Sequence, residues 1–325
     1  MTTITTPRAS VTPPAAAEVA APRIRGVGVL TGWGDGLDAI PAGPDDVAAA
    51  LLTVPTPSLP GERFRRATRE CLLAVAAVRA AAADGALAET ELAGPRTGVV
   101  YASATAYAAA NRAFLEDESS TTLHFPYTAP SAVPGEVTIA FGIRGPYVNL
   151  MGGGPAALQA LWYAAGWLAD GVAERVLVLA VETVHEVWDL FARARRLYDR
   201  PLLEGAACLL LEPGGDGALR WASATDDGGT ARGRSSAVRA VIESVLGDQR
   251  PAAIASSAPR TARLTTAALA GHAAPAPRPL PGEAMACGPL IGLGRARASR
   301  AEGPYLFTAA WRNDYAALLW PRFMA

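Results

Sequence analysis

The chain contains no lysine, so all 29 of its basic residues are arginines. Without a lysine amine, a protein forms no Schiff base with a carbonyl substrate, and it lacks the lysine of phosphate-binding loops and of protein kinases. Those enzyme classes are therefore excluded. The arginines are balanced by 30 acidic residues, which gives a formal net charge of −1. A nucleic-acid-binding protein needs a basic surface, so no nucleic-acid partner is expected.

Cysteine and histidine are scarce, with three of each. The three cysteines are odd in number and far apart, which gives neither a disulfide framework nor the paired spacing of a metal site. They are Cys71, Cys208 and Cys287. Glu182, His185 and Glu186 come nearest to a metal motif, but their spacing matches no recognised one. We expect no metal, and a reducing cytoplasm is the expected location.

Long apolar runs are also missing, because none reaches the roughly 18 residues that a membrane span needs. Residues 1–22 have no signal-peptide apolar region, and their threonine, proline and alanine content predicts a flexible N-terminal tail. The rest is not disordered in character, since half of the 325 residues are hydrophobic and only 18% are charged. That composition and length suffice for a large buried core.

From residue 23 onward, short β-rich runs alternate with alanine- and leucine-rich runs, which predicts an α/β fold. Expected strands cover residues 24–30, 98–104, 146–150, 175–181, 205–213, 252–257, 305–311 and 315–320. Expected helices cover 63–87 with a stop at Gly85, 155–171, 237–246, and a segment after Gly288. The glycine- and aspartate-rich run 214–236 is expected to join an N-terminal half, 23–213, to a C-terminal half, 214–325.

Several enzyme motifs can be set aside. Gly26 and Gly28 superficially suggest a dinucleotide-binding loop, but their spacing is wrong and no helix follows directly, so a structural role is favoured. No Gly-x-Ser-x-Gly motif is present, and the three scattered histidines give no Ser-His-Asp set.

The informative stretch is a glycine turn, Gly152–Gly154, between a strand ending at Leu150 and a helix opening with Pro155. Backbone N–H groups at such a helix start point at whatever lies over the turn. In acyl-transfer enzymes this arrangement carries the nucleophile together with an oxyanion hole. Here the last residue of the turn is Gly154, which has no side chain.

This stretch resembles the nucleophile region of β-ketoacyl synthases of the thiolase superfamily, the condensing enzymes of fatty-acid and polyketide synthesis. The resemblance covers residues 24–321 and is stronger in the first half. It is also carried by the segments 25–40, 130–146, 200–213, 278–294 and 306–320. It implies a single integrated thiolase-like domain, in which two pseudo-repeated βαβ halves form α-β-α-β-α layers and the second half is shortened.

The resemblance places the family's chemical positions on other residue types. The nucleophilic cysteine falls on Gly154, the first histidine near Ser257, and the second histidine on Glu283. The family's lysine falls on Arg278 and its asparagine on Asn313. The glycines before that asparagine are replaced, and their larger side chains would crowd a pocket beneath them; these residues are Ala309, Ala310 and Trp311.

Condensation needs a thiolate to hold the acyl chain and two neutral imidazoles to assist decarboxylation. A glycine, a serine and a carboxylate cannot supply both. The resemblance therefore implies a chain-length-factor-like subunit without condensing activity, which partners an active ketosynthase in type II polyketide or related fatty-acyl biosynthesis, as in antibiotic pathways. A heterodimer is expected rather than a homodimer. No resident cofactor is expected, because an acyl carrier protein presents the phosphopantetheine-bound chain.

Two other functions stay open. In the first, a remodelled pocket catalyses cyclisation, dehydration or isomerisation of a carrier-bound chain: Gly152–Gly154 would hold a thioester carbonyl, and Glu283, with Ser257, Arg278 or Cys287, would move a proton. The expected substrate-binding positions are Gly152, Gly153, Gly154, Glu283 and Asn313. A buried Glu283 beside Arg278 is more often a structural ion pair, and Cys287 is expected to be a small core residue rather than a displaced nucleophile.

In the second, the chain is a scaffold that binds acyl carrier protein through arginines. The candidate groups are Arg63, Arg65, Arg66 and Arg69, and Arg193, Arg195 and Arg196; such runs are also typical of a solvated helix face. Trp162 and Trp167 are expected to lie either in a subunit interface or in the core.

Overall fold

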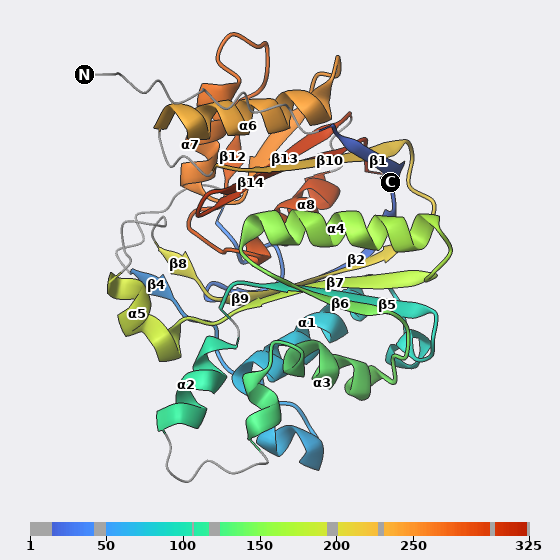
Figure 1. Ribbon diagram of the computed structural model, residues 1–325. Helices are drawn as coiled ribbons and strands as arrows, with labels where there is room; N and C mark the ends of the chain where they lie inside the picture. Colours follow the sequence, from blue (N-terminus) through green and yellow to red (C-terminus); the bar gives the residue numbers. More distant parts are fainter. Residues whose placement is uncertain are drawn as a thin grey trace, which may run out of the picture.

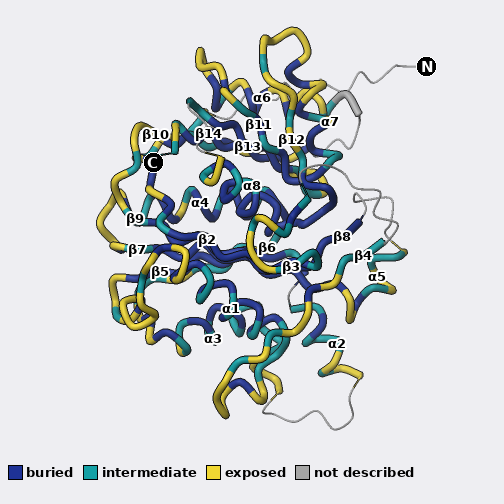
Figure 2. The backbone as a smooth tube through the Cα atoms, turned by 180° about the vertical axis from the view of Figure 1, so that it is seen from behind, coloured by how far each residue is buried: buried dark blue, intermediate teal, exposed yellow. Residues whose placement is uncertain are grey.

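The computed structural model describes residues 15–41, 50–105, 107–116, 124–193, 201–226, 231–299 and 303–323. Two six-stranded sheets lie one above the other, with helices between them and on both outer faces (Figure 1). The α-β-α-β-α layering expected from the sequence is confirmed. Figure 2 shows that the buried chain is concentrated in the sheets and in the helices between them.

The first sheet has the strand order β3-β2-β9-β7-β5-β6. Its strands are β2 (Arg23–Thr31), β3 (Gly34–Asp35), β5 (Thr97–Ser103), β6 (Tyr147–Met151), β7 (Arg175–Glu182) and β9 (Gly205–Glu212). The central strands β5, β7 and β9 are buried along almost their whole length. Helices cover both faces of this sheet, which explains why these strands are continuous apolar runs rather than alternating ones.

The second sheet has the order β1-β10-β14-β13-β11-β12. Its strands are β1 (Ala17–Ala20), β10 (Ala218–Thr225), β11 (Ala253–Ser256), β12 (Arg278–Pro279), β13 (Tyr305–Trp311) and β14 (Asp314–Trp320). A further small sheet pairs β4 (Leu51–Leu52) with β8 (Leu202–Leu203).

Two sequence-based expectations are wrong in the second sheet. The predicted flexible tail, 1–22, includes β1, which pairs antiparallel with β10; residues 1–14 lie outside the described residues. The predicted joining segment, 214–236, includes β10 itself and the start of a helix. Its glycine- and aspartate-rich flanks dominate the composition, whereas the strand is stabilised by pairing with β14 and β1, which are remote in sequence.

The helices form the remaining layers. α4 (Gly154–Ala169) and α8 (Cys287–Ser299) lie between the sheets. α1 (Arg69–Asp84) and α3 (Ala132–Phe141) cover the outer face of the first sheet, and α6 (Ala231–Leu246) and α7 (Pro259–Ala268) cover that of the second. The shorter elements are α2 (Ala108–Glu116), α5 (Trp188–Arg193) and the 3₁₀ turns η1 (Glu62–Arg66), η2 (Glu89–Leu92), η3 (Phe125–Thr128) and η4 (His185–Val187). Among the described helices, none combines the length and apolar character needed to cross a membrane.

Small residues set the close spacing of these layers. A β-carbon at Gly26 would lie 2.0 Å from the carbonyl oxygen of Ala81, and one at Gly28 would lie 2.0 Å from that of Ala77. β2 therefore packs directly on the backbone of α1, and the structural role expected for these two glycines is confirmed. α1 itself begins at Arg69 rather than at residue 63, because Ala67 has an extended conformation.

Candidate functional site

The site expected from the sequence lies where β6 passes into α4. The N–H of Gly152 donates to the carbonyl oxygen of Ser103 at 2.9 Å, which ties the turn to the end of β5. Gly153 is the residue before the helix, and its carbonyl accepts from the N–H of Ala156 at 3.0 Å. Gly154 opens the helix and is buried. The strand, turn and helix are thus arranged as the sequence predicts.

The space at Gly154 is filled by neighbouring side chains, whereas a cavity of about 280 Å³ lies beside Gly152 and Gly153 and is also lined by Trp221 and Trp311. A β-carbon at position 154 would lie 2.9 Å from the β-carbon of Ala309 and 3.2 Å from the β-carbon and hydroxyl oxygen of Ser257. A β-carbon at position 153 would lie 2.6 to 2.8 Å from the indole ring of Trp311. Any side chain at position 154 would therefore require its neighbours to move.

Ser257 is the second residue that the structure brings to this place. It follows β11 and is only 3% exposed. Its N–H donates to the carbonyl of Thr308 at 2.9 Å, and its hydroxyl lies 3.2 Å from that of Thr261. These contacts hold the serine against Gly154 from the side of the second sheet.

Glu283 is 5% exposed and is not among the residues nearest to a β-carbon at position 154. One carboxylate oxygen accepts from the N–H of Met285 at 3.0 Å. Trp311 and Arg312 share with it the lining of a cavity of about 10 Å³. Such a volume holds one water at most, so it is too small for an acyl chain. The backbone strain here lies at Met285, whose φ of 47° is in the left-handed region.

The structure does not bring Arg278 and Asn313 to the same place. Arg278 lies in β12 and lines a different cavity from that of Glu283. Within the described residues it forms no ion pair, so the possible Glu283–Arg278 pair is wrong. Asn313 is exposed in the turn between β13 and β14, where its carbonyl accepts from the N–H of Asp226 at 2.8 Å.

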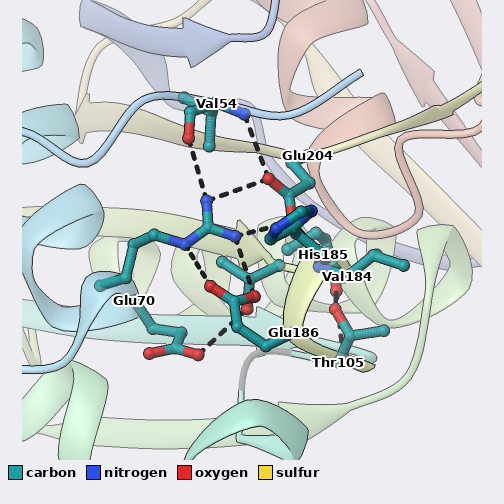
Figure 3. A network of polar contacts seen from close by, with 10 residues as sticks. Val54, Glu70, Thr105, Val184, His185, Glu186 and Glu204 are labelled. Carbon is teal, nitrogen blue, oxygen red and sulfur yellow. Dashed lines mark hydrogen bonds and ion pairs between the residues drawn. The ribbon is translucent and has the colours of Figure 1, made fainter. Parts of the chain in front are cut away.

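A buried polar network that the sequence patterns did not predict lies beside the small β4–β8 sheet (Figure 3). The guanidinium of Arg69 donates to both carboxylate oxygens of Glu204, at 2.7 and 2.9 Å, and to Glu186 at 2.7 and 3.0 Å. Glu204 also accepts from the N–H groups of Val184 and His185, each at 2.6 Å. The sequence signal that could have indicated this network is Glu204, a single acidic residue within the apolar run after Pro201.

This network corrects the predicted role of Arg69 as part of a docking patch. Burial lowers its pKa, but the hydrogen bonds and charges of Glu204 and Glu186 outweigh burial and raise the pKa above its ordinary value. Arg63 and Arg65 are paired as well, with Glu136 and Glu62. The residues Arg195 and Arg196 lie outside the described residues, while Arg193 ends α5.

A second buried carboxylate, Glu182, connects the two halves. Its oxygens accept from the N–H groups of Ala104 at 2.9 Å, Thr105 at 3.0 Å and Ala286 at 3.1 Å. Burial is the main influence and raises the pKa of Glu182 to about 7, although these hydrogen bonds act in the opposite direction. No cluster of three potential metal ligands occurs in the described ranges.

The remaining predicted residues are part of the core. Cys287 is buried, its thiol donates to the carbonyl of Gly205, and burial raises its pKa well above the usual value. The core role expected for it is confirmed. Trp162 stacks on Trp221 with ring centroids 6.1 Å apart, and Trp162 and Trp167 both pack against the core between the sheets. This supports the core alternative for these two tryptophans.

Comparisons with known proteins agree with this arrangement. A search of curated proteins gave no match. Among solved structures, the ishigamide ketosynthase/chain length factor is 20% identical, with a TM-score of 0.75 over 94% of this chain and all of that one. A type II polyketide synthase acyl-carrier protein in complex with its ketosynthase bound to the hexaketide is 16% identical, with a TM-score of 0.75 over the same shares.

A β-ketoacyl synthase from Burkholderia phymatum STM815 is 18% identical, with a TM-score of 0.73 over 94% of this chain and all of that one. At these identities the likeness establishes the fold alone. The family model for the N-terminal domain of β-ketoacyl synthases matches residues 56–219, which is half of the chain. The match includes the glycine turn and most of the first sheet, and the chain therefore belongs to the β-ketoacyl synthase family.

Proposed function

We propose that this protein is a non-condensing ketosynthase-like subunit, which partners an active ketosynthase in type II polyketide or related fatty-acyl biosynthesis in the cytoplasm. The observation that carries the proposal is the packing at Gly154. Covalent acyl transfer needs a nucleophile at this position. Here the position has no side chain, and Ala309 and Ser257 occupy the space that a cysteine would need.

The other polar residues near the turn do not replace the missing chemistry. The hydroxyl of Ser257 is paired with Thr261 rather than with a histidine or carboxylate base. Glu283 would add negative charge where a condensing reaction develops carbanion character, which is the wrong sign. Both residues suit a packed interior better than an acyl-binding pocket. The role of this chain would then be to shape the acyl-binding pocket of its partner subunit.

The open edge of the first sheet supports a partner subunit. β6 pairs with β5 on one side and with no other described strand. Two of its side chains, Tyr147 and Met151, are 58% and 45% exposed, and Ile139 on α3 and Tyr163 on α4 are 67% and 41% exposed. An edge strand with exposed apolar side chains is a template for pairing with another chain.

The choice of a ketosynthase as the proposed partner subunit rests on analogy with solved structures of the same fold. One of them is described as a ketosynthase with a chain length factor, and another as a ketosynthase in complex with an acyl-carrier protein. By analogy, the partner of this chain would be a ketosynthase that retains its cysteine. The growing chain would be presented on the phosphopantetheine of an acyl carrier protein, and we propose no resident cofactor.

The test is co-expression with a type II ketosynthase and its acyl carrier protein, followed by mass spectrometry of the carrier-bound products. We expect a heterodimer, and products that depend on the presence of this chain. Met151→Glu should abolish co-purification, because it places a charge on the apolar edge. Leu190→Glu is the matched control, since Leu190 is 51% exposed on α5, away from this edge.

Two results would refute the proposal. One is a homodimer whose presence leaves the ketosynthase products unchanged. The other is conversion of a preformed carrier-bound chain by this protein alone, with the conversion lost in Glu283→Gln, which would favour the remodelled-pocket enzyme.

A further inference from the structure

A sizeable cavity lies away from the glycine turn. It measures about 440 Å³ and lies between α8 and the end of the second sheet formed by β11 and β12. Figure 2 shows β12 at that end of the sheet, next to β11. This cavity shares no lining residue with the cavities beside Gly152 or Glu283. Its volume lies in the range of small-molecule sites.

Small residues on both walls create the cavity. Ala253 and Ala255 on β11 face Gly292 and Ala296 on α8, one turn apart. A β-carbon at Gly292 would be 3.8 Å from Ala255 and from Phe307, which is ordinary contact. A larger side chain could therefore be accommodated at position 292, yet the space is left open. Leu280 and Ile254 add further apolar lining.

Two arginines line this cavity, and no acidic residue is among its described lining residues. Arg278 lies on β12 and is exposed, and Arg295 lies on α8 and is half-buried. Within the described residues neither forms an ion pair or a hydrogen bond to an acid. Burial lowers the pKa of Arg295, and the positive charge of Arg278 lowers it further. Two cations held together without a counter-charge destabilise the empty protein.

Three hydroxyl-bearing residues line the same cavity, Ser256, Ser299 and Tyr305, and the hydroxyl of Ser256 is paired with that of Thr308 at 2.7 Å. Ser299 follows Arg295 by one helical turn, so both side chains lie on one face of α8. The hydroxyl of Ser299 lies 3.1 Å from that of Tyr305 and donates to the carbonyl of Ala296 at 2.8 Å. Since the serine proton is already used, Tyr305 is the donor of this pair. Both hydroxyl protons are thus used within the protein, so hydrogen bonds to an anion in this cavity would come from the two arginines.

We propose that this cavity is a binding site for a small-molecule anion, in which Arg278 and Arg295 hold a carboxylate or phosphate head and the alanine-lined space holds a short apolar body. Planar guanidinium groups match carboxylate and phosphate oxygens with paired hydrogen bonds. An anion would supply the missing counter-charge, and the small side chains would supply room for its apolar part.

The test uses hexyl phosphate and hexanoate as probes, with 1-hexanol as the neutral probe and inorganic phosphate as the head group alone. Binding is measured on the full chain by calorimetry and by the rise in melting temperature. We expect one or both amphipathic anions to bind, with hexanol silent and inorganic phosphate weaker. The comparison between hexyl phosphate and hexanoate identifies the head group.

Variants separate a built site from general attraction of anions to arginine. Arg295→Gln and Arg278→Gln should each weaken binding about tenfold, since each removes charge-assisted hydrogen bonds. Arg295→Gln should also raise the melting temperature of the empty protein. Gly292→Leu should block binding without changing the charge. Arg66→Gln is the control, because Arg66 is an exposed arginine on η1, beside the opposite sheet.

Three outcomes would overturn the proposal. The first is the absence of binding by either amphipathic anion at millimolar concentration. The second is equal weakening by Arg295→Gln and Arg66→Gln, which would mean nonspecific charge attraction. The third is unchanged binding in a folded Gly292→Leu protein, which would place the anion elsewhere.

Discussion

At the scale of single residues, the main feature of this protein is the fit of two glycines to larger neighbours. Gly153 contacts the indole of Trp311, and Gly154 contacts Ala309 and Ser257. The space beside these two glycines is therefore occupied by Ala309 and Trp311 on β13 and by Ser257 after β11. Because a side chain at position 154 would collide with Ala309, substitutions at these two positions can be tested as a pair.

We predict that Gly154→Ala destabilises the protein by about 1–3 kcal/mol, because overpacking a rigid interior forces neighbouring groups apart. Adding Ala309→Gly should recover much of the loss by removing the closest atom. Urea denaturation of both variants measures this. Gly166→Ala on the same helix is the control, since a β-carbon there meets nothing within 4 Å. It should stabilise by up to about 1 kcal/mol through helix propensity; equal effects at positions 154 and 166 would contradict the packing argument.

At the scale of elements, Glu204 ties together segments that are far apart in the sequence. It lies between β8 and β9, and its partners are Arg69 on α1, Val54 after β4, and the N–H groups that open η4. Every polar atom of the carboxylate is used, and its side chain is fully buried. Such a network fixes one arrangement of the four elements, because a displaced element would leave a charge buried without its partner.

We predict that Glu204→Gln lowers the free energy of unfolding by about 3–5 kcal/mol, since it leaves the half-buried Arg69 without its main counter-charge. Equilibrium unfolding in urea measures the loss. Glu62→Gln is the matched control, because it breaks a surface pair with Arg65 and should change stability by less than about 1 kcal/mol. A small loss for both variants would mean that Glu186 alone satisfies Arg69.

At the scale of the whole molecule, Glu182 connects the first sheet to the helix between the sheets. It is the last residue of the central strand β7 and accepts from the N–H groups of Ala104 after β5 and of Ala286 before α8. Its protonation therefore affects contact between the two halves. Because burial raises its pKa to about 7, the folded state retains a proton over a pH range in which the unfolded chain has lost it.

The sign of the pH dependence follows from this difference. Below the unfolded pKa both states are protonated, and the stability contribution is complete. Between the ordinary glutamate value and about 7 only the folded state is protonated, so stability falls as pH rises. We predict a loss on the order of 3 kcal/mol between pH 4.5 and pH 8, measured by urea denaturation at each pH. Glu182→Gln should be less stable overall but should show a flatter profile; an unchanged slope would assign the dependence to another group.

Much of the first half could be predicted from the sequence. The strands β5, β7 and β9 are continuous apolar runs, and α4 opens directly after the glycine turn, so local pattern and tertiary position agree. β1 and β10 could not be predicted in this way. β1 has four residues, and β10 lies between glycine-rich flanks, so each depends on hydrogen bonds to a strand that is remote in sequence.

The candidate site likewise has features that could be predicted from the sequence and features that could not. The sequence alone was enough for the fold class, for the glycine at position 154, and for the residues Ala309, Ala310 and Trp311 near the end of β13. These depend on residue type and order, which the sequence states directly. Three facts came only from the folded arrangement: Trp311 covers Gly153, Arg278 lies with Arg295 rather than with Glu283, and Arg69 is buried with Glu204. The residues in these contacts are up to 158 positions apart in the sequence, and such contacts are set by how the layers pack.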